Sequence, residues 1–137
     1  MEGISDADAL KRLDTKANHM AWITGSIIYE RFSMAELFGS DLKAQADELF
    51  KDFKGIQDTA IYPGLTDYLK DWDLITPVYR ELLCNVSDEK LDSIFKMTDF
   101  EMPYFDLISF MIYREANMIG QLALWRRLLG YDGMKYM

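Results

Sequence analysis

The sequence has little cysteine, histidine and proline, and it contains no long uncharged apolar run. Its 137 residues include one cysteine, one histidine and three prolines. A lone Cys84 cannot form a disulfide within the chain, which favours a reducing, cytoplasmic environment. Because no run of about 18 apolar residues exists, we expect no membrane-spanning segment. The first residues are acidic where a signal peptide requires a basic start and an apolar stretch.

Positive charge is also scarce. Fifteen lysines and arginines stand against 23 aspartates and glutamates, so the formal net charge is −8 at pH 7. A negative field repels phosphate backbones and anionic lipid surfaces, which makes nucleic acid and membranes poor partners. The chain also contains no glycine-rich phosphate loop and no Ser-His-Asp pattern.

What the chain does contain is enough apolar material for one core. Half of the residues are hydrophobic, 14% are aromatic and nine are methionine. A chain of this length fits a single compact domain, here residues 1–137. Apolar spacings of three and four dominate and no strand pattern is present. The sequence therefore predicts an all-α fold of four or five helices.

The clearest predicted helix covers residues 104–129. Asp99 or Thr98 can cap it, Pro103 suits its first turn, and Gly130 suits a left-handed stop. Eight residues recur along it at spacings of four and three: Tyr104, Ile108, Met111, Glu115, Met118, Leu122, Trp125 and Leu129. This pattern predicts a buried seam with Glu115 as its one charged member.

The other helices are predicted at residues 18–38, 40–53, 66–83 and 87–95. Gly39 ends the first of them, and Ser40 and Ser87 are the expected caps of the second and fourth. Pro77 should kink the third or divide it in two. The intervening segment, residues 54–65, is predicted to be a loop with a turn at Pro63-Gly64.

Two short stretches of the sequence resemble each other. GISDADAL at residues 3–10 parallels NVSDEKLD at residues 85–92. The second stretch lies between two long helices, whereas a helix before the first would lie upstream of Met1. The chain therefore reads as a four-helix bundle that lacks or swaps its first helix. An apolar groove left open in this way is most simply closed by a second copy, which predicts a homodimer.

Residues 18–39, NHMAWITGSIIYERFSMAELFG, and residues 114–136, beginning REANMIGQLALW, resemble the two signature segments of the DinB-like (DinB/YfiT-like) family. The resemblance implies a four-helix bundle, usually dimeric. Many family members hold a divalent metal with three histidines, and some act on thiol-cofactor conjugates. One histidine follows the glycine in W-x-x-G-H, and the other two lie in H-E-A-x-H-x-G-Q.

This sequence departs from the family pattern at the three ligand positions. Ser26 follows W-I-T-G, and Arg114 and Met118 occupy the paired positions of R-E-A-N-M. A guanidinium stays protonated and only donates, while serine and methionine are poor ligands for a divalent metal at neutral pH. We therefore expect no family-type metal centre and no cofactor, with a cation at Arg114 where relatives hold the metal.

Two interpretations of the charged residues on these helices stay open. Arg114 and Glu115, with Ser26, Met118 and Trp22, can form a polar pocket for a small anionic or apolar ligand. Alternatively, Arg114 and Glu115 form internal ion pairs with residues such as Glu30 or Arg31 that hold the bundle in register. A buried carboxylate needs one or the other, because it must be paired or protonated.

His19 and Trp22 have two interpretations each, and Cys84 has one. His19 is either a proton shuttle at a pocket mouth or a helix-start histidine bonded to backbone, since it lacks partners at ligand spacing. Trp22, with Met111, Met118 and Trp125, either lines a ligand cavity or fills the core. Cys84 has no basic partner nearby in sequence, so we expect a buried, inert thiol.

These observations favour a DinB-like bundle without the three-histidine site, acting as a small-molecule-binding or non-catalytic homodimer. The alternative is a metal-dependent thiol transferase of the same family. A third class is an interaction protein whose bundle pairs with a partner helix. The missing histidines are the argument against the enzyme.

Overall fold

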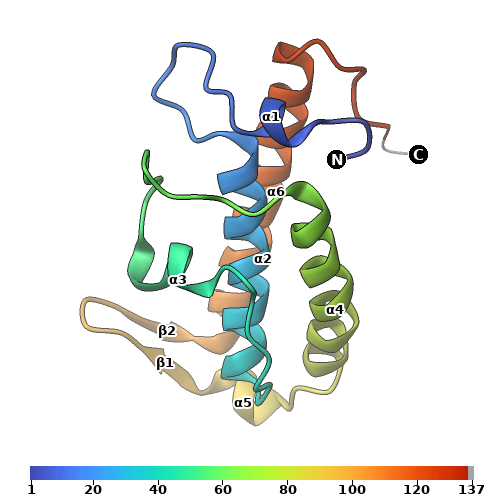
Figure 1. Cartoon of the computed structure of the whole chain (residues 1–137). Coiled ribbons are helices and arrows are strands. Elements are labelled where there is room, and N and C mark those ends of the chain that lie inside the picture. Colours follow the sequence, from blue (N-terminus) through green and yellow to red (C-terminus); the bar gives the residue numbers. More distant parts are fainter. Residues whose placement is uncertain (136–137) are drawn as a thin grey trace.

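The computed structural model describes residues 1–135 of the chain (Figure 1). Its helices are α1 (Asp6–Ala9), α2 (Met20–Leu37), α3 (Asp47–Phe50), the 3-10 turn η1 (Lys51–Phe53), α4 (Leu65–Cys84), α5 (Asp88–Asp92) and α6 (Tyr104–Leu128). Two short strands, β1 (Ile94–Lys96) and β2 (Glu101–Pro103), precede α6. The predominantly helical prediction is confirmed, while the all-α prediction is wrong at this small hairpin.

Helix α2 is the centre of the structure. Its buried residues lie on nearly all sides, as expected of a helix enclosed by other elements. Helices α4 and α6 both pack on α2, with α4 running in the same direction as α2 and α6 in the opposite direction (Figure 1). Three long helices are therefore present in residues 1–135, and the full four-helix bundle stays a prediction.

The two similar sequence stretches form the same local structure. Ser5 caps α1 with φ/ψ of −78/152°, and its side chain accepts from the Asp8 N–H. Ser87 caps α5 with φ/ψ of −78/153° and accepts from the Lys90 N–H in the same way. Each short helix comes before a long one, α2 or α6. The predicted cap at Ser87 is therefore confirmed, and Ser5 caps α1 in the same way.

The two glycines predicted to end the long helices, Gly39 and Gly130, are confirmed in that role. Gly39 and Gly130 follow the ends of α2 and α6 with φ of +101° and +87°, a conformation that favours glycine. The predicted caps of the last helix are wrong, because Thr98 and Asp99 lie in the β1–β2 hairpin. Pro103 is the residue immediately before α6, with no side-chain cap.

The hairpin is stabilised by aromatic contacts that the helical prediction for residues 87–95 did not include. Ile94 pairs with Pro103 and Lys96 with Glu101 in antiparallel register. The Phe95 ring lies 5.6 Å from the Tyr104 ring and 6.3 Å from the Phe100 ring. Phe95 of β1 therefore contacts both the hairpin turn, at Phe100, and the first residue of α6, Tyr104, and such aromatic contacts are favourable. The short helix α5 therefore ends at Asp92, and the chain extends from Ser93 onward.

The helix predicted at residues 40–53 is reduced to the single turn of α3. The N–H and side-chain amide of Gln45 donate to the buried Asp71 carboxylate at 2.8 and 2.9 Å. This tertiary contact holds residues 41–45 out of a helix, and Ser40 accepts from Leu42 N–H rather than capping a helix. Long-range hydrogen bonding has overridden local helix propensity here.

Helix α4 begins at Leu65, whose N–H donates to an Asp6 carboxylate oxygen at 2.8 Å. It continues through Pro77 to Cys84, so the prediction of a divided helix is wrong. The prediction of a buried Cys84 is also wrong. This last residue of α4 is exposed.

The close packing of α2 depends on Gly25. A Cβ at this position would lie 2.4 Å from the Phe50 ring and 2.6 Å from the Tyr68 hydroxyl. Both of those side chains are buried, so neither can move aside easily.

Within residues 1–135, no helix has both the length and the apolar character needed to cross a membrane.

Candidate functional site

The antiparallel contact of α2 with α6 brings together four of the residues named from sequence. Arg114 Nη2 lies 2.5 Å from Glu30 Oε1. Ser26 lies one turn before Glu30 on α2, and Met118 lies one turn after Arg114 on α6. Because the helices run in opposite directions, these turns face each other. Ser26 and Met118 are both buried.

Arg31 and Glu115 form the second ion pair of this seam. The guanidinium donates from Nε and Nη2 to the two Glu115 oxygens at 2.8 and 2.6 Å. Its Nη1 donates to Thr76 Oγ1 at 2.7 Å, and its Cζ atom lies 3.6 Å from the centre of the Trp72 ring. This bidentate, stacked arrangement ties α2 to both α4 and α6.

The structure therefore supports the ion-pair interpretation of Arg114 and Glu115. Each of the two side chains has a partner of opposite charge on α2, so neither is left to meet a ligand alone. A cavity of about 120 Å³ lies next to these two ion pairs. It is lined by Glu30, Arg31, Met34, Tyr79, Met111, Ile112 and Glu115. This volume is well below that of ordinary ligand pockets.

Burial shifts the pKa values of two groups on this seam. It raises the pKa of Glu30 above its ordinary value, and the neighbouring Glu115 carboxylate acts in the same direction. The positive charge of Arg114 opposes the rise. Burial also raises the pKa of Tyr79 to about 12, so its hydroxyl stays neutral at physiological pH. The cluster therefore consists of two pairs of opposite charge, each joining α2 to α6.

The residues at the family's ligand positions do not fit a divalent metal. Arg114 offers only donors and already holds Glu30, and Ser26 and Met118 supply a hydroxyl and a thioether. Throughout residues 1–135, histidine, cysteine, aspartate and glutamate nowhere gather in a group of three or more that can hold a metal. No chemical step through a metal is derived from this donor set.

His19 lies at the start of α2, apart from this seam. Its Nδ1 accepts a hydrogen bond of 3.0 Å from the Trp22 N–H, so His19 is the cap of α2. Its ring packs edge-on against Tyr62 at 4.8 Å and is buried. The helix-start interpretation of His19 is confirmed. Trp22 itself packs on Phe50 at 6.0 Å as part of the core margin.

We expect the His19 cap to make stability depend on pH. Burial lowers the pKa of His19 below its ordinary 6.5, and Nδ1 accepts only when unprotonated. The contribution is therefore complete above about pH 6.5 and is lost as pH falls through the lowered pKa. His19→Asn should keep the cap and lose this acid sensitivity, whereas His19→Ala should cost about 1 kcal/mol at pH 7.5.

Urea unfolding of the three proteins at pH 7.5 and pH 5 measures this effect. Equal acid sensitivity in the native chain and in His19→Asn would show that protonation of His19 is not the cause. Because Asn also caps helices through its side-chain oxygen, the comparison isolates the titrating ring from the loss of a cap.

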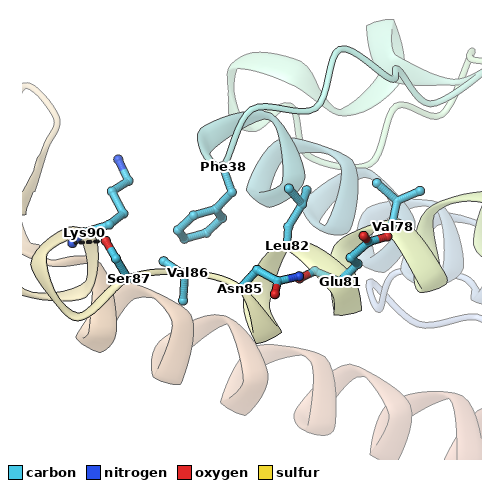
Figure 2. Close-up of a pocket in the computed structure, with 8 residues that line it drawn as sticks. All are labelled: Phe38, Val78, Glu81, Leu82, Asn85, Val86, Ser87 and Lys90. Carbon is cyan, nitrogen blue, oxygen red and sulfur yellow. Dashed lines mark hydrogen bonds between the residues drawn. The ribbon is translucent and has the colours of Figure 1, made fainter.

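Two larger cavities lie away from the α2–α6 ion pairs. Figure 2 shows one of about 330 Å³, between the end of α4 and the start of α5, lined by Phe38, Val78, Glu81, Leu82, Asn85, Val86, Ser87 and Lys90. Apart from the Glu81 carboxylate, its polar side chains already have contacts within the chain. Ser87 caps α5, Asn85 donates to the Glu81 carbonyl, and the Lys90 ammonium lies 3.6 Å from the Tyr104 ring centre. No convergent polar set is left for a ligand.

The other cavity is an apolar groove of about 270 Å³ where α2, α4 and α6 meet. Its walls are Met1, Met20, Thr24, Ile27, Ile28, Leu69, Trp72, Ile119, Leu122, Arg126 and Met134. The buried Thr24 hydroxyl has no hydrogen-bond partner among the described residues. The sequence did not predict this groove, because its walls come from three helices, Met1 and Met134, whose relative placement a single sequence does not reveal.

Comparisons with protein-family models, with curated proteins and with solved structures found no match. The DinB-like resemblance therefore continues to depend on the residues of the two signature segments. In the structure, Ser26, Arg114 and Met118 lie on the α2–α6 seam, where Arg114 is paired with Glu30.

Proposed function

We propose that the chain is a DinB-like helical module that forms a non-catalytic homodimer, with ion pairs in place of the family's metal site. The single observation that carries this proposal is the exposed apolar face of α6. Phe105 and Ile112, seven residues apart and therefore on one face of this helix, are 60% and 59% exposed. Exposed apolar side chains on one helix face are typical of protein–protein contacts.

The ion pairs of the α2–α6 seam favour association over the alternative of a thiol transferase. A metal-dependent transferase needs ligands that deprotonate or carry free lone pairs, and Arg114 has neither. Its pairing with Glu30 also occupies a carboxylate that lies one helical turn from Ser26.

A second candidate function, small-molecule binding, is favoured by the groove between α4 and α6. Its walls are mainly apolar, and the unpartnered Thr24 hydroxyl offers one hydrogen bond inside it. A small apolar molecule with one polar group fits this description. Thermal-shift measurements with short-chain fatty acids test it, because a ligand that binds only the folded chain raises the midpoint of unfolding.

Sedimentation equilibrium of the native chain tests the homodimer. We expect a concentration-dependent dimer with a dissociation constant in the micromolar range or below, as interfaces with an apolar centre usually give. Elemental analysis of the same sample should show no stoichiometric transition metal. A strict monomer at about 100 µM, or a tightly held zinc or nickel ion, would contradict the proposal.

A further inference from the structure

We infer that two copies of the chain pair through α6 in antiparallel orientation, along one stripe of that helix. This inference rests on the proposed homodimer and specifies its interface. The stripe consists of Phe105, Ser109, Ile112, Ala116, Ile119 and Ala123. A second copy of the chain is the occupant of this surface.

The stripe is a second apolar seam of α6, distinct from the seam that packs on α2. Its members are separated by four, three, four, three and four residues, so they share one face of the helix. Phe105 and Ile112 are 60% and 59% exposed, Ser109 and Ala116 are also exposed, and Ile119 and Ala123 are half-buried. Among the described residues, the half from Phe105 to Ala116 is therefore exposed, whereas Ile119 also packs against the core.

The spacing of the stripe reads the same in both directions. An antiparallel second copy therefore meets it position for position, as a two-fold interface requires. In this register Phe105 lies opposite Ala123 of the partner subunit, and Ile112 lies opposite Ala116 of the partner subunit. Ser109 lies opposite Ile119 of the partner subunit. Every large side chain meets a small one, which is how packed helices interdigitate.

Ser109 is compatible with burial in this apolar stripe. Its hydroxyl donates to the Phe105 carbonyl one turn earlier at 2.9 Å, so its hydrogen-bonding need is met within α6. Burying a hydroxyl that already has a partner avoids the desolvation cost of an unpaired polar group.

Charge along α6 also favours the antiparallel orientation. Asp106 lies in its first turn and Arg126 and Arg127 lie in its last turn. Glu101 precedes the helix and has only an exposed contact of 3.3 Å with Lys96. Antiparallel pairing brings the acidic end of each helix to the basic end of the other. It also places the two helix dipoles in opposite directions, which is favourable. A parallel pair would place like charges together.

The proposed contact also reaches the apolar groove. Ile119 belongs both to the stripe and to the wall of the groove between α4 and α6. A second copy laid on the stripe would therefore contact one wall of the groove, at Ile119.

Disulfide trapping tests both orientation and register. In a Cys84→Ser background, Phe105→Cys/Ala123→Cys and Ser109→Cys/Ile119→Cys each place a pair of thiols across the proposed two-fold axis. The first pair is 18 positions apart on one helix, about 27 Å, so it cannot close within a chain. We expect both double variants to give more than about 80% covalent dimer under mild oxidation, because facing Cβ atoms lie within disulfide range.

The four single-cysteine variants are the controls, and each should remain below about 10% covalent dimer. Crosslinking by the singles would indicate a parallel pair and overturn the inference. Failure of both doubles while sedimentation still reports a dimer would overturn this interface and leave the homodimer standing. A monomer would remove both. Circular dichroism identifies a misfolded double, in which case the other double decides.

A charge-insertion pair gives an independent reading of the same surface. Ala116→Glu places two carboxylates near the centre of the stripe, whereas Asn117→Glu adds the same charge on the adjacent exposed face. We expect dimerisation to weaken about 100-fold or more in the first variant and less than about 3-fold in the second. Equal effects of the two substitutions on the dissociation constant would contradict the assigned face.

Discussion

Replacing Arg31 with leucine is expected to lower the midpoint of thermal unfolding by about 10 °C. The substitution removes two bonds to Glu115, one to Thr76 and the stacking on Trp72. It also leaves Glu115 as a half-buried carboxylate without a partner, and stranding one member of a buried pair costs several kcal/mol. Because both side chains keep some contact with solvent, we expect a loss of about 3 kcal/mol.

Calorimetry of the native chain and three variants measures this loss. Lys70→Leu is the matched control, because the Lys70–Asp67 pair is mostly exposed and should contribute less than about 0.5 kcal/mol. Arg31→Lys keeps the charge without the bidentate geometry and should fall between them. If Arg31→Leu proves as stable as Lys70→Leu, the cluster does not hold the three helices together.

Local signals in the sequence predicted the helical framework well. The glycines after α2 and α6 and the serines before α1 and α5 act through their own backbone and nearest neighbours, so a sequence reveals them directly. The same holds for the seam of α6 that contains Glu115, whose members are buried or half-buried as predicted.

The errors fall where distant residues decide the outcome. The contact of Gln45 with Asp71 removes most of a predicted helix. Packing of Phe95 on Tyr104 stabilises the hairpin. Its two strands have three residues each, which is too short for an alternation of apolar and polar residues to indicate a strand. Cys84 is exposed because it is the last residue of α4, and this placement depends on tertiary structure.

The candidate site was predicted in part for a related reason. Ion pairs between α2 and α6 were one of two open interpretations, since the sequence places the charges on the right helices without pairing them. The second apolar stripe of α6 was not recognised. A helix that is apolar on two faces does not indicate which face the rest of the chain covers, and only the position of α2 resolves this.

Restoring three histidines at the family's ligand positions is expected to create a metal site. In Ser26→His/Arg114→His/Met118→His, two imidazoles lie one turn apart on α6 and the third faces them from α2. Loss of Arg114 leaves Glu30 unpaired, so the metal-free variant should be less stable than the native chain. We expect it to bind one zinc or nickel ion with a dissociation constant of about 1 µM or tighter.

Titration calorimetry and metal-dependent unfolding measure this gain. At about 100 times the dissociation constant, the ion should stabilise the triple variant by about 2.7 kcal/mol. Ser26→His/Met118→His is the control, because it retains the Arg114 cation between two imidazoles and should bind at least about 100-fold more weakly. A folded triple variant that binds no better than this control would mean that α2 and α6 do not bring these three positions together in a geometry that holds a metal. The signature segments would then resemble the family in sequence without sharing the geometry of its site.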